Sequence, residues 1–174
     1  AMKGKLGLLQ AATALQEEIL NPQMSFDEDT GILAAETKLA QNAKKTALMV
    51  LGTAAQKYMM ELANQQEVLL NCADIIMDAY QMETAILRAK KYAEANGEEA
   101  AGRYIDMASV YCNDAMQRVE AAAKNTIAAI AEGDEGRTLL VALKRFTKNN
   151  SPVNTIAARQ RIADVLIAAN TYTY

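Results

Sequence analysis

The chain has 174 residues, of which 51% are hydrophobic and 22% charged, with a net charge of −3 and no histidine. This length can bury one sizeable core, and the composition is that of a folded globular protein rather than a disordered one. The acids and bases are interspersed, which argues against nucleic acid as a partner, and no apolar stretch reaches the roughly 18 residues needed to span a bilayer.

The first expected helix covers residues 2–20 and ends at Asn21-Pro22. The basic and apolar residues at its start superficially resemble a signal peptide, but Gln10 interrupts the apolar run, so we expect a helix and no leader. The acidic segment 23–30 follows, and its carboxylates suit a position just before a helix N-terminus.

A second helix is expected over residues 32–63, and Gly52 inside it indicates a close contact with another helix. Asn64-Gln65-Gln66-Glu67 resembles a capping box, in which Asn64 would accept from the backbone N–H of Glu67. We therefore expect a break there, with an uninterrupted helix over 32–95 as the alternative. The apolar stripe of the second helix consists of Leu48, Leu51, Ala55, Met59 and Leu62.

The third helix is expected over 64–95, and it stops at Asn96-Gly97, a strong C-cap pair. The fourth covers 98–132. Asp134 is expected to cap a short fifth helix over 134–147, and a turn follows. Asn154 or Thr155 then caps a last helix over 154–169.

Core-type residues step by threes and fours along the third and fourth helices, the spacing that keeps one stripe facing a neighbouring helix. The stripes are Val68, Cys72, Ile75, Ala79, Met82, Ile86 and Ala89, and Ala101, Ile105, Ala108, Cys112, Ala115, Val119 and Ala122. Short joints make consecutive long helices antiparallel. We therefore predict one all-α domain over 1–174. It is an up-and-down, four-helix-bundle-like arrangement completed by the first or last helix, with one or two extra short helices and no sheet.

The absence of histidine excludes Ser-His-Asp and Cys-His nucleophiles, HExxH zinc sites and the Glu-x-x-His pairs of di-iron bundles. Asp74 and Asp78, four apart on the third helix with Glu83 further along, are the remaining candidates for acid–base chemistry. Three interpretations stay open: a solvated flank, an ion pair with a base on a neighbouring helix, or a small enzyme that uses either aspartate as its base. No residue is assigned a catalytic, cofactor-binding or metal-binding role.

Cys72 and Cys112 lie on core stripes, so we expect buried free thiols in a reducing compartment, which favours the cytoplasm. A disulfide would need a geometry that spacing cannot show. The methionines of the long helices are core filler or an adaptable interface: Met49, Met59, Met60, Met77 and Met82. Bases that flank the second and third helices are mixed with acids, which argues against attachment to a membrane surface: Lys38, Lys44, Lys45, Arg88, Lys90 and Lys91.

Four segments, in their order and spacing, resemble the C-terminal extension of bacterial acyl-CoA dehydrogenases. They are Met2-Lys3-Gly4-Lys5-Leu6, Cys72-Ala73-Asp74-Ile75-Ile76-Met77-Asp78-Ala79-Tyr80-Gln81-Met82-Glu83, Leu143-Lys144-Arg145-Phe146-Thr147 and Pro152-Val153-Asn154-Thr155-Ile156-Ala157-Ala158-Arg159. The pattern of Ala73-Asp74, Asp78, Tyr80 and Met82 is also similar to the extension of very-long-chain acyl-CoA dehydrogenases.

The resemblance implies that this chain is only the appended helical domain of a larger flavoenzyme. Such parents oxidise acyl-CoA to 2,3-enoyl-CoA in fatty-acid β-oxidation, with FAD and a glutamate base in an upstream catalytic region. The implied partner is that catalytic domain, and no cofactor is expected in this chain. One apolar stripe should then stay exposed, so we expect homo-oligomers. The alternative is a free-standing helical adaptor that binds a partner helix in a groove lined by Met and Ala.

Overall fold

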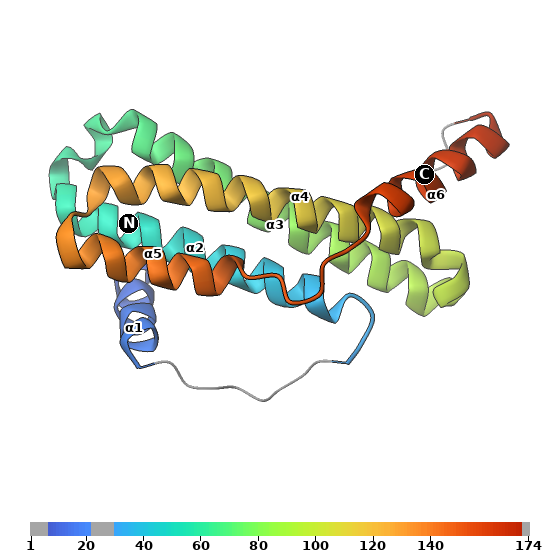
Figure 1. Cartoon of the computed structure of the whole chain (residues 1–174), viewed down its shortest axis with the longest axis horizontal. Helices are drawn as coiled ribbons and strands as arrows, with labels where there is room; N and C mark the ends of the chain where they lie inside the picture. The colour runs from blue at the N-terminus through green and yellow to red at the C-terminus, as the bar shows by residue number, and fades with distance from the viewer. Residues whose placement is uncertain (1–6, 22–29, 172–174) are drawn as a thin grey trace.

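The computed structural model describes residues 7–21 and 30–171, and helices are the only regular elements in these ranges (Figure 1). The all-α prediction is therefore confirmed. The expected start of the first helix at residue 2, most of the acidic segment 23–30 and the last three residues lie outside the described ranges. The elements are α1 (Leu8–Leu20), α2 (Ala34–Tyr58), the 3-10 helix η1 (Met59–Asn64), α3 (Gln66–Asn96), α4 (Glu98–Ile130), α5 (Gly133–Thr147) and α6 (Thr155–Ala169).

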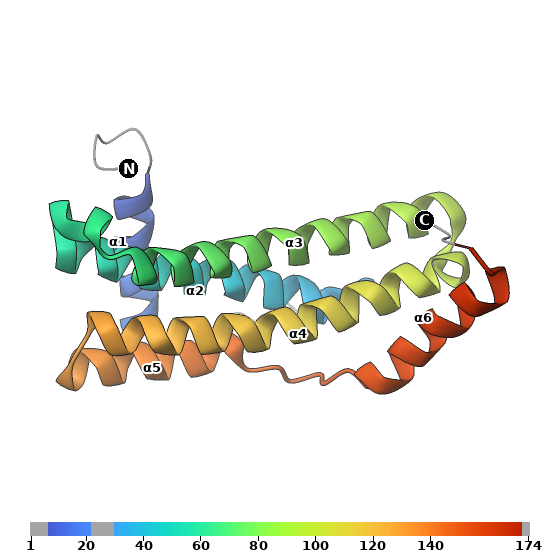
Figure 2. The ribbon, with the colours of Figure 1, turned by 90° about the horizontal axis from the view of Figure 1, so that it is seen from above.

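Three long helices, α2, α3 and α4, lie side by side and form the body of the bundle (Figure 2). Gly97 alone joins α3 to α4, as the C-cap of one and the N-cap of the other. Its φ of +88° is a conformation that suits glycine, so the stop predicted at Asn96-Gly97 is confirmed. Contacts of Lys44 with Glu83 and of Lys57 with the Ala129 carbonyl set α2 antiparallel to α3 and parallel to α4.

The fourth position of the bundle is filled by α5, which packs against both α2 and α4 at the end near the α4–α5 turn (Figure 1). It buries Leu139, Leu143 and Phe146 there. The prediction that the first or last helix completes the bundle was wrong. The joint between Ile130 and Gly133 is so short that the chain must fold straight back after α4. By contrast, α1 packs on α2 and α6 packs on α4.

Helix α1 lies across α2 rather than along it (Figure 2). The crossing point is Gly52, where an added Cβ would lie 2.6 Å from the Cβ of Ala12. The close helix contact predicted from Gly52 is therefore confirmed. Two polar contacts pin the crossing helix: Lys45 pairs with Glu18 at 2.5 Å, and Gln16 donates to Gln56 at 3.1 Å.

The second helix ends earlier than predicted, at Tyr58 rather than residue 63. Met59, with a φ of +48°, breaks the helix, and η1 follows. A contact with α4 fixes the C-terminal end of α2. The Lys57 ammonium and the Tyr58 hydroxyl both donate to the carbonyl of Ala129, at 3.0 and 3.1 Å. The predicted break between the second and third helices is thus confirmed, although it begins at Met59 rather than at residue 64. The uninterrupted helix over 32–95 is excluded.

Two of the three predicted side-chain caps were wrong. The Asn64 amide donates to Glu61 at 2.7 Å instead of capping α3, whose N-cap is Gln65, because the 3-10 turn brings these side chains together. Asp134 lies inside the first turn of α5, where it pairs with Arg137 at 3.0 Å. Asn154 does cap α6, since its side-chain oxygen accepts from the backbone N–H of Ala157 at 3.0 Å.

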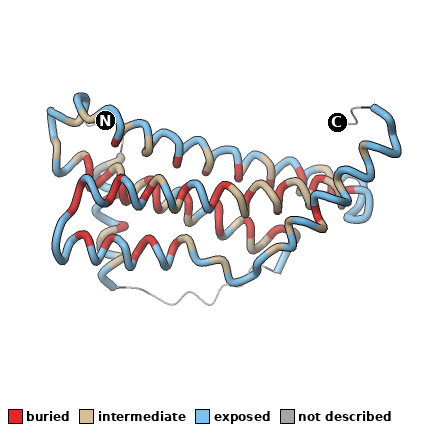
Figure 3. The backbone as a smooth tube through the Cα atoms, turned by 45° about the horizontal axis from the view of Figure 1, so that its top comes forward, coloured by how far each residue is buried: buried red, intermediate tan, exposed pale blue. Residues whose placement is uncertain are grey.

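Buried residues lie on the sides of the long helices that face one another (Figure 3). The stripe predicted for α3 is wholly buried, and that for α4 is buried or half-buried. On α2, however, the predicted stripe is only half-buried or exposed, and the core side is formed instead by residues such as Ala43, Val50 and Ala54. Helix α2 carries apolar residues on two adjacent faces; Leu39 is buried on the core face, and Leu48 and Leu51 are half-buried on the outer one.

Candidate functional site

The two candidate aspartates have different surroundings. Asp78 accepts from Arg118 on α4 through Nε at 3.1 Å and Nη2 at 2.6 Å, and from the Tyr111 hydroxyl at 3.0 Å. Asp74 is exposed. The structure therefore supports the ion-pair interpretation for Asp78, which fastens α3 to α4, and the solvated-flank interpretation for Asp74.

The Asp78 cluster shifts the titration of its neighbours. Burial, followed by the hydrogen bond to Asp78 and its charge, raises the pKa of Tyr111 above its ordinary value. The hydrogen bond to Asp78 also raises the pKa of Arg118. Both groups are protonated at neutral pH at their ordinary pKa values, and the upward shifts move their deprotonation to still higher pH, so the contact between the helices does not titrate near pH 7.

Both cysteines are free and buried, as predicted. Burial raises the pKa of Cys72 to about 11, and burial together with the charge of Glu36 raises that of Cys112 to about 12. The pairs Asp78–Arg118 and Tyr92–Tyr104 fix the antiparallel register of α3 and α4. In that register the two cysteines are offset by 12 residues, which is roughly 18 Å along the helix axes and too far for a disulfide.

The sequence reasoning missed a buried carboxylate. Glu36, in the first turn of α2, accepts from the Ser109 hydroxyl of α4 at 2.6 Å, and both side chains are buried. Neither residue lines the hollows described below. A single glutamate near a helix start gives no warning of this burial, because the partner comes from a segment 73 positions away.

The basic residues and methionines named from the sequence lie partly in contacts between helices or in the core and partly on the exposed surface. Lys44 pairs with Glu83 at 2.5 Å, and Lys90 donates to the Thr37 hydroxyl at 3.2 Å, so part of the basic set links helices. Met49 and Met82 are core residues. The other three methionines, Met59, Met60 and Met77, are exposed, so they are not core filler, and the interface alternative stays a prediction for them.

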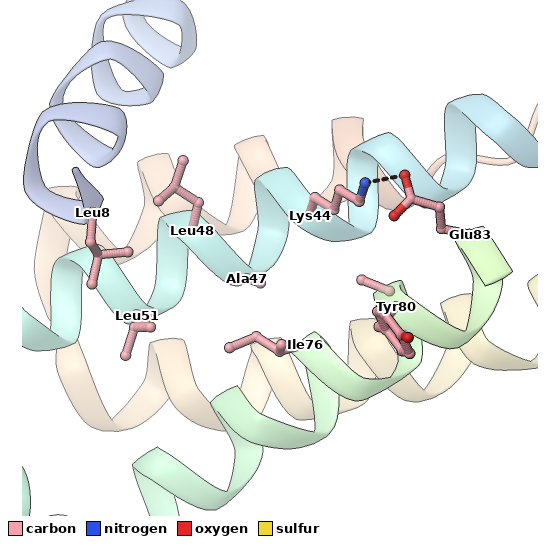
Figure 4. Close-up of a pocket in the computed structure, with 9 residues that line it drawn as sticks. Leu8, Lys44, Ala47, Leu48, Leu51, Ile76, Tyr80 and Glu83 are labelled. Carbon is pink, nitrogen blue, oxygen red and sulfur yellow. Dashed lines mark hydrogen bonds and ion pairs between the residues drawn. The ribbon is translucent and has the colours of Figure 1, made fainter. Parts of the chain in front are cut away.

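An apolar groove runs between α2 and α3 and is closed at one end by α1 (Figure 4). Its volume is about 330 Å³, and carbon atoms make up nearly all of its wall. The ion pair of Lys44 and Glu83 borders it. The lining residues are Leu8, Lys44, Ala47, Leu48, Leu51, Ile76, Ala79, Tyr80 and Glu83.

The groove continues onto an exposed apolar band of α3, here called the outer stripe. The side chains of Ile76, Met77, Tyr80 and Leu87 are 46%, 51%, 68% and 60% exposed. Helix α3 therefore presents apolar residues both to the core and to the surface. The outer stripe consists of Ala73, Ile76, Met77, Tyr80 and Leu87.

A second hollow of about 550 Å³ lies where α2 meets the α4–α5 turn, and its wall includes Lys57, Glu132 and Glu135. Neither hollow fits a flavin dinucleotide. The groove offers almost no donors, and in the second hollow two carboxylates would repel a pyrophosphate that needs clustered N–H groups. Within the described ranges, no group of three or more acids and cysteines is placed to hold a metal, and no helix is long and apolar enough to cross a bilayer.

Comparison with known families gives a match for residues 42–145, which cover most of α2, all of α3 and α4, and nearly all of α5. The matching family is described as "Acyl-CoA dehydrogenase, C-terminal domain". The chain belongs to this family. The resemblance found in the sequence is thereby confirmed, and the family segment coincides with the bundle itself.

Two relatives extend the match to the whole chain. A probable acyl-CoA dehydrogenase of Bacillus subtilis (strain 168) is 37% identical over 173 residues, which is 99% of this chain and 29% of the relative. The crystal structure of an acyl-CoA dehydrogenase complexed with FAD from Bacillus anthracis superposes with a TM-score of 0.93 at 39% identity, again over 99% of this chain and 29% of that one. The chain thus spans less than a third of the relatives it matches.

Proposed function

We propose that this acyl-CoA dehydrogenase C-terminal domain serves a larger flavoenzyme as a packing and interaction unit, and that the oxidation of acyl-CoA to 2,3-enoyl-CoA takes place in polypeptide outside these residues. The observation that carries the proposal is the match over 99% of this chain to dehydrogenases of which it makes up only 29%. The single-domain bundle, its filled interior and its exposed apolar face support the same role.

The surroundings of the domain follow from the same proposal. FAD and the catalytic base belong to the catalytic region, which is the partner of this domain. Free buried thiols suit a reducing compartment, so we place the protein in the cytoplasm, where the parent would act in fatty-acid β-oxidation. We also propose that the protein forms homo-oligomers; in the isolated chain, where the apolar band is uncovered, self-association would use that band.

The test compares the purified 174-residue chain with the product of the whole reading frame that encodes it. We expect the whole product to carry flavin absorbance and to turn over acyl-CoA with an electron acceptor, and the isolated chain to do neither. A flavin bound wholly within the isolated chain would overturn the proposal, as would a reading frame that encodes no dehydrogenase.

The apolar groove favours one alternative, a free-standing helical adaptor that seats a partner helix. This alternative requires a reading frame that starts near Met2. Several hundred dehydrogenase codons in the same frame would eliminate it.

A further inference from the structure

The outer stripe of α3 is more than a scatter of exposed apolar residues. Single surface leucines are ordinary, but contiguous apolar bands mark contact sites. Ala73 and Ile76 are each three or four residues from Met77 or Tyr80, and Leu87 follows Tyr80 after seven residues, so the members of the stripe lie on one side of α3 and extend for about 20 Å. Ile76 and Tyr80 belong both to the stripe and to the groove, so stripe and groove form one surface.

Two opposite charges at the edge of this surface pair with each other. Lys44 and Glu83 meet at 2.5 Å, across the mouth of the groove (Figure 4). The stripe itself contains no charged residue, and its one polar atom is the Tyr80 hydroxyl. Such a surface gains most from an apolar polypeptide face, and it lacks the basic rim that an anionic membrane or an acidic ligand would need.

We propose that the groove and the outer stripe together are the docking surface for a helix of the remaining polypeptide of the same molecule. This inference rests on the proposed function. The chain covers 29% of its relatives, which leaves about 71% (100 − 29) of such a polypeptide to supply the occupant. A groove between two helices, bordered by apolar residues at helical spacing, is the shape that accepts a third helix.

Tethering favours this occupant over a second copy of the chain. A segment joined to the domain by the backbone meets the surface at an effective concentration of about millimolar, which a separate copy reaches only at a similar protein concentration. The docked helix therefore buries Tyr80 and Ile76 within one molecule, and this burial does not change with protein concentration.

Thiol labelling tests the inference in the complete protein. Tyr80→Cys places a thiol on the stripe, and Gln117→Cys places the matched control on the exposed side of α4. Native Cys72 and Cys112 stay silent near pH 7, because both are buried and their pKa values are about 11 and about 12. Maleimide incorporation at each site is followed by peptide mass spectrometry, in the dilute 174-residue chain and in the product of the whole reading frame.

We expect labelling at position 80 to be slower by roughly tenfold or more in the complete protein than in the isolated chain, and labelling at position 117 to be equal in both. Equal rates at position 80 would overturn the inference and leave the proposed function standing. Protection that disappears on dilution would assign the surface to a second copy and also overturn it. A reading frame without a dehydrogenase would remove the proposed function itself.

Discussion

Gly52 is the residue whose side chain, or lack of one, decides how closely α1 approaches the bundle. We predict that Gly52→Ala destabilises the protein by about 1–3 kcal/mol, although alanine is the better helix former, because the added Cβ meets Ala12 at 2.6 Å. Urea unfolding measures the difference.

Gly102 provides the matched control for this prediction. It lies within α4, and a Cβ added there has nothing within 4 Å. Gly102→Ala should therefore stabilise the protein by about 1 kcal/mol. If both substitutions change stability in the same direction, the crossing of α1 over Gly52 is incorrect.

The two thiols make a prediction about pH. Their ordinary pKa of 9.0 is raised to about 11 for Cys72 and about 12 for Cys112, so folding favours the neutral thiols. This contribution to stability is complete below pH 9 and is lost as the pH rises through 11 to 12. The free energy of unfolding should therefore fall more steeply between pH 8 and 11 in the wild type than in a Cys72→Ala, Cys112→Ala variant. Parallel curves of unfolding free energy against pH for the two proteins would contradict this prediction.

At the scale of elements, α6 makes its main packing contacts, among the described residues, with one helix. It packs on α4, and the arginines of its two ion pairs, Arg159 with Asp114 and Arg161 with Asp106, are more than half exposed, so solvent screening weakens both pairs. The cap at Asn154 therefore matters for this helix. We predict that Asn154→Ala, at a cost of about 1 kcal/mol, increases amide hydrogen exchange in α6 and leaves α3 and α4 unchanged.

A control for the cap is Asn125→Ala, an exposed position inside α4. This substitution removes no cap and should not accelerate exchange in α6. Equal exchange in both variants would show that α6 does not depend on its N-terminal residue.

Helix boundaries were predictable where the residue itself sets the backbone and unpredictable where a distant group does. Gly97 requires a positive φ that only glycine adopts easily, so the α3–α4 corner could be read from the sequence. The end of α2 could not be read. Met59 and Met60 are good helix formers, so their identity does not predict the end of α2. That end is marked by a contact with α4, whose Ala129 carbonyl accepts hydrogen bonds from the side chains of Lys57 and Tyr58.

At the scale of the molecule, the same limit applies to the candidate site. Ala73, Ile76, Tyr80 and Leu87 recur at helical spacing and could have been recognised as a second stripe on α3. Periodicity alone does not say which of two stripes faces inward. That choice depends on α2 and α4. Their small buried residues let α3 approach with the face that carries Cys72 and Ala79.

The exposed surface predicts the behaviour of the isolated chain. Without the remaining polypeptide, we expect concentration-dependent self-association through the outer stripe, measured by sedimentation velocity. Tyr80→Lys should weaken it, because a lysine would have to be buried against apolar groups, while Gln117→Lys adds the same charge elsewhere and should not. A chain that stays strictly monomeric at high concentration would count against this expectation.

The corner at Gly97 also limits how the lengths of α3 and α4 can change in evolution or by design. With a single residue between them, there is no slack to absorb a change of length. One amino acid inserted into α4 just after this corner would turn the residues on its two sides by about 100° relative to each other about the helix axis, and part of the apolar side would face away from α3. Changes of length are therefore poorly tolerated inside the two helices next to this corner, where the packed register is set.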